Sequence, residues 1–381
     1  MKAINRLYFL TLVLVAAVAC GVTYSKPTET SQTDFSITFF KTANSLSPEG
    51  ENVVVSPYSA AVALSMLAEG AQGQTREEFD KVLGNVLYRA ADLGNNDSVV
   101  VKSANSLWLN NDFSPRNRYV SLLSNDFDAF LDVENFADPA AVRAINNWCS
   151  EHTEGKISQI ISKLNPREVL VLLNALYFNA PWENEFDASK TSRQTFFGLS
   201  GESSVEMMDN QGYYLYAEQQ GYQIIQLPYK GLRYAMYVVL PPKGTDIDQM
   251  FKTLDKKTID STLDSMQQRK VKLLLPKFKI ETSMSLIKVL QKMGIKTAFT
   301  PAADFGGIVE SGQIAVSEVK QKCFIDVSEK GTEAAAVTSV QIVLTSVRPM
   351  CPVMRVDRPF AFIIADGENE NMLFAGKIVN M

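Results

Sequence analysis

The sequence predicts an α+β fold built as a single large domain. Helical and strand-like segments follow one another without the regular strand–helix–strand repeat of parallel α/β proteins. Although 381 residues would allow two or three domains, no linker rich in Pro, Gly or Ser and no run of like charges divides the chain. Hydrophobic residues make up 46% and charged residues 21%, a balance that suits a protein with a large buried core.

Residues 1–19 are predicted to be a signal peptide that takes no part in the fold. Lys2 and Arg6 supply positive charge, and the apolar stretch that follows is too short for a comfortable membrane span. It ends in Ala17-Val18-Ala19-Cys20, which resembles a bacterial lipobox. We therefore expect Cys20 to be the lipidated first residue of an exported lipoprotein of the bacterial cell envelope, periplasmic or at the cell surface. Plain secretion after cleavage is the alternative.

The mature chain divides into a flexible tether of residues 20–32 and a domain of residues 33–381. A first helix is predicted by apolar residues at helical spacing, namely Phe35, Phe39, Phe40 and Ala43. A second helix is predicted to start at Pro57, because proline fits the first turn of a helix.

The middle of the chain is predicted to supply central strands. The segments from Val99 to Leu109 and from Val169 to Phe178 have the high apolar content of strands that are buried on both faces. Between them, Asp138-Pro139 marks the start of a helix that runs to about Thr153.

The C-terminal half continues the mixture of elements. Ile224 to Leu240 contain two strands around the turn Lys230-Gly231, and a polar helical segment follows near Asp246 to Met266. Lys270 to Ile280 alternate as one strand, and Leu286 to Met293 are helical.

Composition and side-chain inventory argue against an enzyme. The single histidine, His152, is expected at the protein surface, so no hydroxyl or thiol has an evident histidine base. No metal-binding motif and no phosphate-binding glycine loop is present, and we expect neither a metal nor a cofactor. Cys149 and Cys323 are predicted to be buried, whereas Cys351 could be exposed and oxidisable. The net charge of −5 and the lack of a basic, aromatic-rich patch argue against a nucleic-acid partner.

The segment from Glu329 to Leu344 carries the strongest functional signal. It opens with small, flexible and charged residues that are typical of an exposed loop. From Thr332 onward it alternates with the period of a strand, and one face is small or apolar: Thr332, Ala334, Ala336, Thr338, Val340, Ile342 and Leu344. This loop could therefore become a half-buried strand, although an ordinary strand after a turn is the plain alternative.

This segment resembles the hinge of the reactive-centre loop of inhibitory serpins. Other motifs extend the resemblance over nearly the whole mature chain, in the order and spacing of that family. They are Asn52–Ser59, Ala68–Thr75, Thr153–Ile157, Leu173–Phe178 with Trp182, Asp357–Phe360 and Leu373–Lys377. One such motif would be weak, but six in order make the resemblance specific.

The resemblance implies a fold with a large central sheet, additional sheets, about eight or nine helices and an exposed reactive-centre loop at about residues 329–352. It also implies a suicide-substrate inhibitor of serine proteases. In that mechanism the protease forms an acyl bond with the loop. The cleaved loop then inserts into the central sheet as a new strand and traps the protease in a covalent complex.

The resemblance further assigns roles to individual positions. The hinge comprises Gly331, Thr332, Glu333, Ala334, Ala335, Ala336, Val337 and Thr338. The breach, where insertion begins, comprises Trp182, Lys277 and Glu329, and Lys277 is expected to pair with Glu329. The shutter, under the centre of the sheet, comprises Ser56, Ser59, Asn174 and Gln321. Gln321 replaces the usual histidine and cannot become charged between pH 5 and 8, which puts the usual shutter network in doubt.

The spacing of the family places the scissile bond between Thr345 and Ser346. The loop is longer than in a common family member, so the bonds Leu344–Thr345 and Ser346–Val347 remain alternatives.

The residues around this bond favour elastase-like or subtilisin-like proteases as targets. Arg348 precedes a proline, and trypsin-like enzymes cut such bonds poorly. Leu344 makes chymotrypsin-like enzymes a second choice, and cysteine proteases could also be trapped.

A non-inhibitory serpin that serves as a lipid-anchored binding or carrier protein is the alternative function. The hinge lacks the bulky, charged or proline residues that such a protein would show on the inserting face. We expect a monomer with no heparin site, because residues 79–98 leave room for only a short version of the helix that carries such sites.

Overall fold

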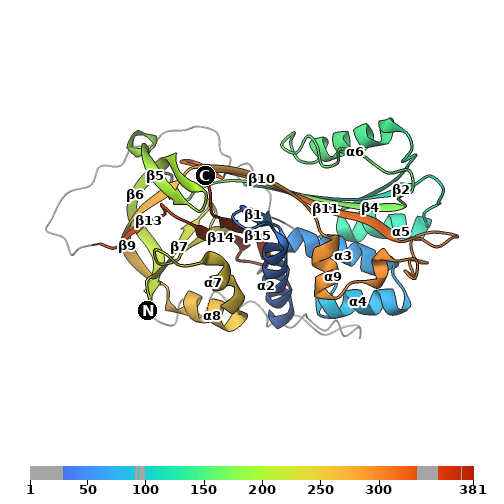
Figure 1. Ribbon diagram of the computed structural model, residues 1–381, viewed down its shortest axis with the longest axis horizontal. Helices are drawn as coiled ribbons and strands as arrows, with labels where there is room; N and C mark the ends of the chain where they lie inside the picture. Colours follow the sequence, from blue (N-terminus) through green and yellow to red (C-terminus); the bar gives the residue numbers. More distant parts are fainter. Residues whose placement is uncertain (1–28, 91–92, 94–98, 333–350, 370) are drawn as a thin grey trace, which may run out of the picture.

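The computed structural model describes residues 29–90, 93, 99–332, 351–369 and 371–381. It confirms the α+β fold, with two large sheets and eight α-helices among the described residues. The molecule is elongated, and Figure 1 shows the larger sheet towards one end and the second sheet extending towards the other.

The second sheet has six strands and contains the first residues of the predicted hinge, Gly331 and Thr332. Its order is β10 (Phe278–Ser285), β11 (Val316–Ser328), β12 (Gly331–Thr332), β4 (Leu170–Pro181), β2 (Val100–Asn110) and β3 (Phe130–Glu134). β4 and β11 pair directly and in parallel from Leu170 to Tyr177 of β4, which we call the lower part of the two strands. At their C-terminal ends, called the upper ends, the two-residue strand β12 lies between them.

The larger sheet has nine strands and forms the other end of the molecule. Its order is β1 (Val53–Val55), β15 (Asn371–Ile378), β14 (Phe360–Asp366), β8 (Tyr234–Leu240), β7 (Tyr222–Pro228), β6 (Gly201–Gln219), β9 (Gln267–Pro276) and β13 (Val353–Arg355), and β5 (Ser192–Gly198) pairs with β6.

The helices cover the two sheets unequally. α6 lies alone on one face of the six-stranded sheet, and α7 and α8 lie under the nine-stranded sheet (Figure 1). None of the helices in the described ranges is long and apolar enough to cross a bilayer. The helices are α2 (Glu29–Leu46), α3 (Pro57–Gly70), α4 (Gly73–Leu83), α5 (Asn117–Phe127), α6 (Pro139–Glu151), α7 (Ile247–Thr253), α8 (Lys256–Ser265) and α9 (Ile287–Met293), with 3₁₀ turns η1 (Ala188–Lys190) and η2 (Thr297–Phe299).

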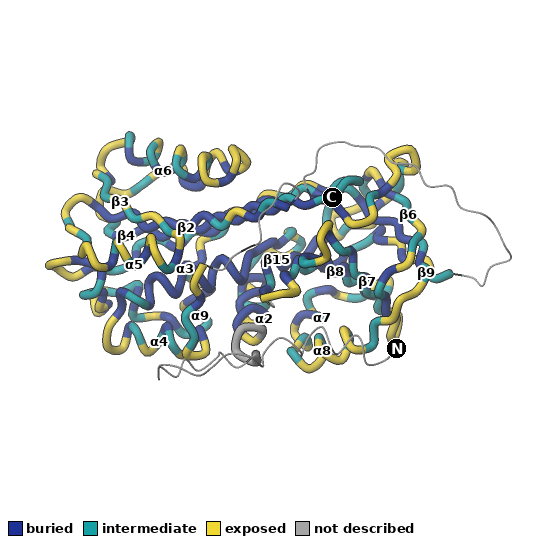
Figure 2. The backbone as a smooth tube through the Cα atoms, turned by 180° about the vertical axis from the view of Figure 1, so that it is seen from behind, coloured by how far each residue is buried: buried dark blue, intermediate teal, exposed yellow. Residues whose placement is uncertain are grey.

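Strand β4 is buried on both faces, as its apolar sequence predicted. Leu172, Leu176 and Phe178 belong to the main core, whereas the alternate residues Leu173 and Tyr177 belong to a smaller core under α6. Figure 2 shows the burial along β4, which is interrupted only near its C-terminal end. Opening the sheet beside β4 therefore disturbs packing on two sides.

Capping residues fix where the two helices next to this sheet begin. The Ser56 hydroxyl accepts a hydrogen bond from the Ser59 amide at 3.1 Å, and Pro57 occupies the first turn of α3. In the same way the Asp138 carboxylate accepts from the Ala140 amide at 2.8 Å at the start of α6.

Three element boundaries differ from the sequence prediction. The single strand predicted over 270–280 is two strands in different sheets, since β9 ends at Pro276 and β10 starts at Phe278. The polar segment 246–266 is two helices, since Asp255 caps a new helix by accepting from the Thr258 amide at 2.7 Å. Helix α2 begins at Glu29, inside the stretch predicted as a tether.

Candidate functional site

The upper end of the six-stranded sheet is held open by the first two residues of the hinge. Thr332 pairs with Val327 of β11 on one side and with Ala180 of β4 on the other. Gly331 and Thr332 are both buried, and the Thr332 hydroxyl lies 2.7 Å from the Tyr229 hydroxyl. The sheet already contains the start of the loop.

The residues before the hinge are fixed by an ion pair and by backbone hydrogen bonds. Lys277 lies 3.2 Å from Glu329, as the resemblance implied, and 3.1 Å from Glu206. The Trp182 amide donates to the Lys330 carbonyl at 2.8 Å, and its indole donates to the Ser328 carbonyl at 2.9 Å. The structure thus brings Trp182, Lys277 and Glu329 together at the point where the loop leaves the sheet.

Glu329 is held in its ionised form. Burial by itself would raise the pKa of this carboxyl, but hydrogen bonds from its own amide, from Thr191 at 2.9 Å and from Lys277 hold the pKa below its usual value. Burial lowers and the two carboxylates raise the pKa of Lys277, and the net direction is upward. Both directions stabilise the charged pair at neutral pH.

The four shutter residues also lie together, at the centre of the sheet. Asn174 of β4 and Gln321 of β11 are register partners, and the Gln321 amide donates to the Asn174 side-chain oxygen at 2.6 Å. The Gln321 side chain also accepts from the Ser56 amide and donates to the Ser56 carbonyl, each at 2.9 Å. The Asn174 amide donates to the carbonyl and the hydroxyl of Ser59. Gln321 therefore completes an uncharged network.

The sequence analysis missed three side chains of these two clusters. Tyr229 reaches the hinge from the β7–β8 turn. Asn105 and Ser103 of β2 extend the shutter, since Asn105 accepts from Asn174 and the Ser103 hydroxyl lies 3.1 Å from that of Ser59. The pattern Ser103-Ala104-Asn105 inside an apolar strand was a signal for the shutter extension, because buried polar groups need partners.

The remaining candidate residues lie away from these clusters. His152 is exposed and stacks on Trp148 with ring centroids 4.3 Å apart. Cys149 and Cys323 are buried, and burial raises the pKa of the Cys149 thiol to about 12. Cys351 is partly exposed and contacts the Gln211 amide at 3.0 Å.

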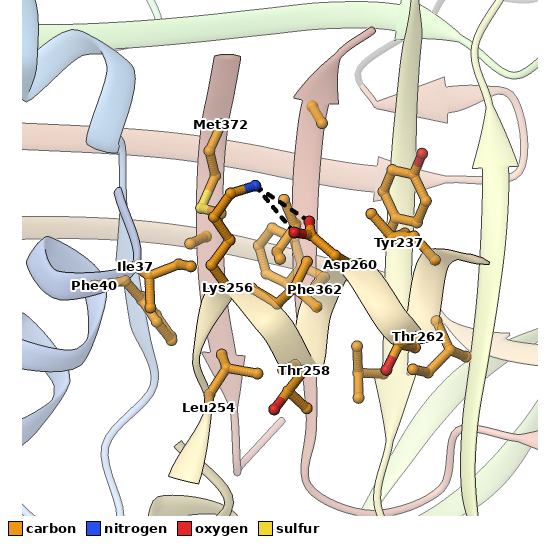
Figure 3. Close-up of a pocket in the computed structure, with 18 of the residues that line it drawn as sticks. Ile37, Phe40, Tyr237, Leu254, Lys256, Thr258, Asp260, Thr262, Phe362 and Met372 are labelled. Carbon is orange, nitrogen blue, oxygen red and sulfur yellow. Dashed lines mark hydrogen bonds and ion pairs between the residues drawn. The ribbon is translucent and has the colours of Figure 1, made fainter. Parts of the chain in front are cut away.

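A cavity of about 740 Å³ lies between α2, α8 and the nine-stranded sheet. In Figure 3, Ile37 and Phe40 face it from α2, and Phe362 and Met372 face it from the strands. Alanines of the sheet leave this space unfilled: Ala217, Ala361, Ala365 and Ala375. The charged residues on its wall are ion-paired, Lys256 with Asp260 at 3.1 Å and Asp366 with Arg233 at 2.8 Å. The cavity is therefore mostly apolar and carries no unpaired charge.

Several predicted residues lie outside the described part of the chain. These are Cys20, the hinge residues from Glu333 to Thr338, and the scissile candidates Leu344, Thr345, Ser346 and Val347.

Comparisons with known proteins agree with this geometry. A family model described as "Serpin (serine protease inhibitor)" matches residues 30–381. A serpin-like protein of Thermococcus kodakarensis is 35% identical over 373 residues, which cover 93% of this chain and 86% of that protein. The native structure of the thermophilic serpin tengpin has a TM-score of 0.87 at 30% identity and covers 94% of this chain and 96% of its own. Thyroxine-binding globulin in complex with thyroxine has a TM-score of 0.82 at 26% identity and covers 92% and 98%.

We expect Glu329→Gln to lower the free energy of unfolding by about 1 kcal/mol at pH 7, because it removes one charge of a partly buried pair. The folded-state pKa of Glu329 is lowered, so the stabilisation exists above its unfolded value of about 4.3 and is lost as the pH falls through the folded value. Urea unfolding at pH 7 and pH 3 would measure this. Glu206→Gln is the matched control, because Glu206 pairs with the same Lys277. Equal losses of stability in the two variants would contradict a special stabilising role of Glu329.

We expect Gln321→Ala to lower the free energy of unfolding by about 2–3 kcal/mol. It would leave both backbone groups of Ser56 and the Asn174 oxygen buried without this partner. Gln226→Ala is the control, because Gln226 is a strand amide whose side chain donates to Tyr237 in the other sheet. A change no larger than that of the control would show that the Gln321 contacts are not structurally important.

Proposed function

Because the chain belongs to the serpin family of serine protease inhibitors, we propose that it is an inhibitory serpin that traps its target protease by inserting the cleaved loop into the six-stranded sheet. The observation that supports this most directly is the position of β12. Gly331 and Thr332 lie between β4 and β11, and the two strands keep the same alignment at β12 as where they pair directly.

The register of β12 predicts where further loop residues would go. Thr332 lies between Ala180 and Val327, and the same row alignment continues down the sheet to Asn174 beside Gln321. Two-residue steps from Thr332 would place Ala334 and Ala336 in the main core. Insertion would then need the strands to separate sideways without sliding along each other.

The same register would place Thr338 between Asn174 and Gln321. Separating the two strands breaks the direct hydrogen bond between their side chains. A threonine hydroxyl can both donate and accept, so it could replace that bond in the inserted state. The hinge sequence thus provides small residues where apolar strands must part and a hydroxyl where the polar network must part.

Insertion must be completed before the acyl bond to the protease is hydrolysed. Protease turnover of about 1–10³ s⁻¹ leaves at most about a second. Each new backbone hydrogen bond contributes roughly 0.5–1.5 kcal/mol, so a full strand could outweigh the cost of ordering the loop. The native state would then be metastable, with its more stable form accessible after cleavage.

We assign the scissile bond to Thr345–Ser346 and the targets to elastase-like or subtilisin-like enzymes. The assignment rests on the resemblance and on the residues around this bond. We also propose that Cys20 carries a lipid and that the inhibitor is tethered at a bacterial membrane surface, as the lipobox-like sequence suggests.

Mixing the mature protein with excess neutrophil elastase is expected to give a covalent complex that survives denaturing electrophoresis. Mass spectrometry should find a released peptide that starts at Ser346. If elastase, subtilisin, chymotrypsin and papain all cleave the loop without forming a complex, the proposal of inhibition is wrong.

We expect cleavage of the loop to raise the melting temperature of the wild-type protein sharply and that of Thr332→Arg much less. Position 332 faces the core, and an arginine there would have to bury a charge. The control is Glu333→Arg, since the alternation of the sequence places residue 333 on the opposite face. Equal gains in all three proteins would contradict the insertion mechanism.

A second candidate function, a carrier for small molecules, is supported by the cavity at α2 and α8. Its volume of about 740 Å³ is in the range of small-molecule sites. A structural neighbour is a thyroxine-binding globulin in complex with thyroxine. Because the charges on the cavity wall are paired with each other, the lining favours a neutral, mostly apolar ligand.

If the carrier function holds, the neutral and mostly apolar probe N-phenyl-1-naphthylamine should bind the mature protein. Ala217→Phe, which places a large side chain on the lining of the cavity, should weaken binding by about tenfold or more, and Ala188→Phe at an exposed position should not. Fluorescence titration would measure both. Absence of binding by this probe, or equal binding by the two variants, would reject this function.

A further inference from the structure

The hinge is tied to the body of the protein by a buried pair of hydroxyl groups. The Tyr229 and Thr332 oxygens lie 2.7 Å apart, and both residues have 0% exposed surface. Tyr229 is itself fixed by stacking on Trp182, with ring centroids 4.5 Å apart and planes 14° apart. It also makes an edge contact with Phe178. A rigid aromatic cluster therefore aims one hydroxyl at the second residue of β12.

Gly331 shows that this placement of the hinge is specific. Its φ of +154° disfavours side chains, and a Cβ there would lie 2.2 Å from the Ala180 carbonyl oxygen and 2.5 Å from the Pro181 Cα. Both contacts are with backbone that cannot move aside easily. Residue 331 must be glycine for the hinge to lie against β4 in this position.

We propose that Tyr229 is a positioning residue for inhibition, which holds Gly331 and Thr332 in the sheet before the protease cleaves the loop. Insertion would then start from a strand whose first two residues are in register, so the slow initiation of a new strand is already complete. This inference rests on the proposed inhibitory function and adds a determinant of its efficiency.

If the hinge is already in register, insertion of the loop is faster than hydrolysis of the acyl-enzyme in a larger share of the molecules. The acyl-enzyme either hydrolyses and releases an active protease or is trapped when the loop inserts. Slower insertion sends a larger share of the molecules to hydrolysis. The number of inhibitor molecules consumed per protease inhibited, the stoichiometry of inhibition, therefore reports the rate of insertion relative to hydrolysis.

A double-mutant cycle tests the pair. Tyr229→Phe keeps the stacking ring but leaves the Thr332 hydroxyl buried without this partner, and Thr332→Val does the reverse. We expect each single variant to slow insertion relative to hydrolysis by about two- to tenfold, the range for one buried hydrogen bond, and so to raise the stoichiometry with neutrophil elastase. The double variant has no unsatisfied hydroxyl and should return towards the wild-type stoichiometry.

Tyr237→Phe is the matched control, because the Tyr237 hydroxyl accepts from Gln226 in the other sheet. Its stoichiometry should equal that of the wild type. Gly331→Ala is a second probe, since it displaces the hinge by steric contact. Adding the Tyr229→Phe and Thr332→Val substitutions, which remove both hydroxyls, should not bring its stoichiometry back towards the wild type. Additive losses in the double variant, or unchanged stoichiometry in Tyr229→Phe, would overturn the proposal.

Hydrogen–deuterium exchange on the uncleaved protein separates this inference from the proposed function. We expect the Gly331 and Thr332 amides to be protected in the wild type and to exchange about two- to tenfold faster in Tyr229→Phe. This holds whether or not a protease is trapped. If no protease forms a complex while these amides behave as expected, the inhibitory function fails and the anchoring by Tyr229 stands. Unprotected amides in the wild type would refute the anchoring itself.

Discussion

The parallel pairing of β4 with β11 is the constraint on which the rest of the structure depends. Along their lower parts the two strands are bonded directly to each other, and at their upper ends β12 separates them. β4 is buried by the main core on one face and by the smaller core under α6 on the other. The two strands therefore cannot separate without disturbing both cores. The two strands thus bond directly where both cores cover them, and they are separated by β12 at one end.

Two polar clusters stabilise β4 and β11, one at their upper ends and one at the centre of the sheet, and they do so by different physical means. At the top, the Lys277–Glu329 pair is charged and partly exposed, so its contribution depends on pH and is screened by salt. At the centre, the shutter is a set of amides and hydroxyls that do not change charge near neutrality. Gln321 bonds to both backbone groups of Ser56, which anchors β11 to the start of α3. Gln321, which stands where the resemblance implies a histidine, takes part in this network through both ends of its side-chain amide.

The sequence predicted the elements that depend on local patterns. Helix starts at Pro57 and Pro139 follow from caps and prolines, and the buried strands follow from unbroken apolar runs. Local patterns failed where two elements follow each other closely. An alternating run over 270–280 gives no sign that the chain changes sheets at Pro276, because both strands have the same period. The break between the two helices at Asp255 is marked in the sequence only by the capping residue itself. The polar composition of residues 246–266 gives no other sign that one helix ends and another begins.

The sequence by itself determined the family and singled out the residues of the breach and the shutter, because the resemblance is carried by short motifs along the chain. The alternation of the hinge stays a prediction from its sequence. Only the tertiary structure decided that Thr332 already lies in the sheet, that Tyr229 holds it and that Asn105 joins the shutter. Thr332 and Tyr229 are separated by 103 positions in the chain. No local pattern records such a contact, because it arises from the alignment of β4, β11 and the β7–β8 turn in space.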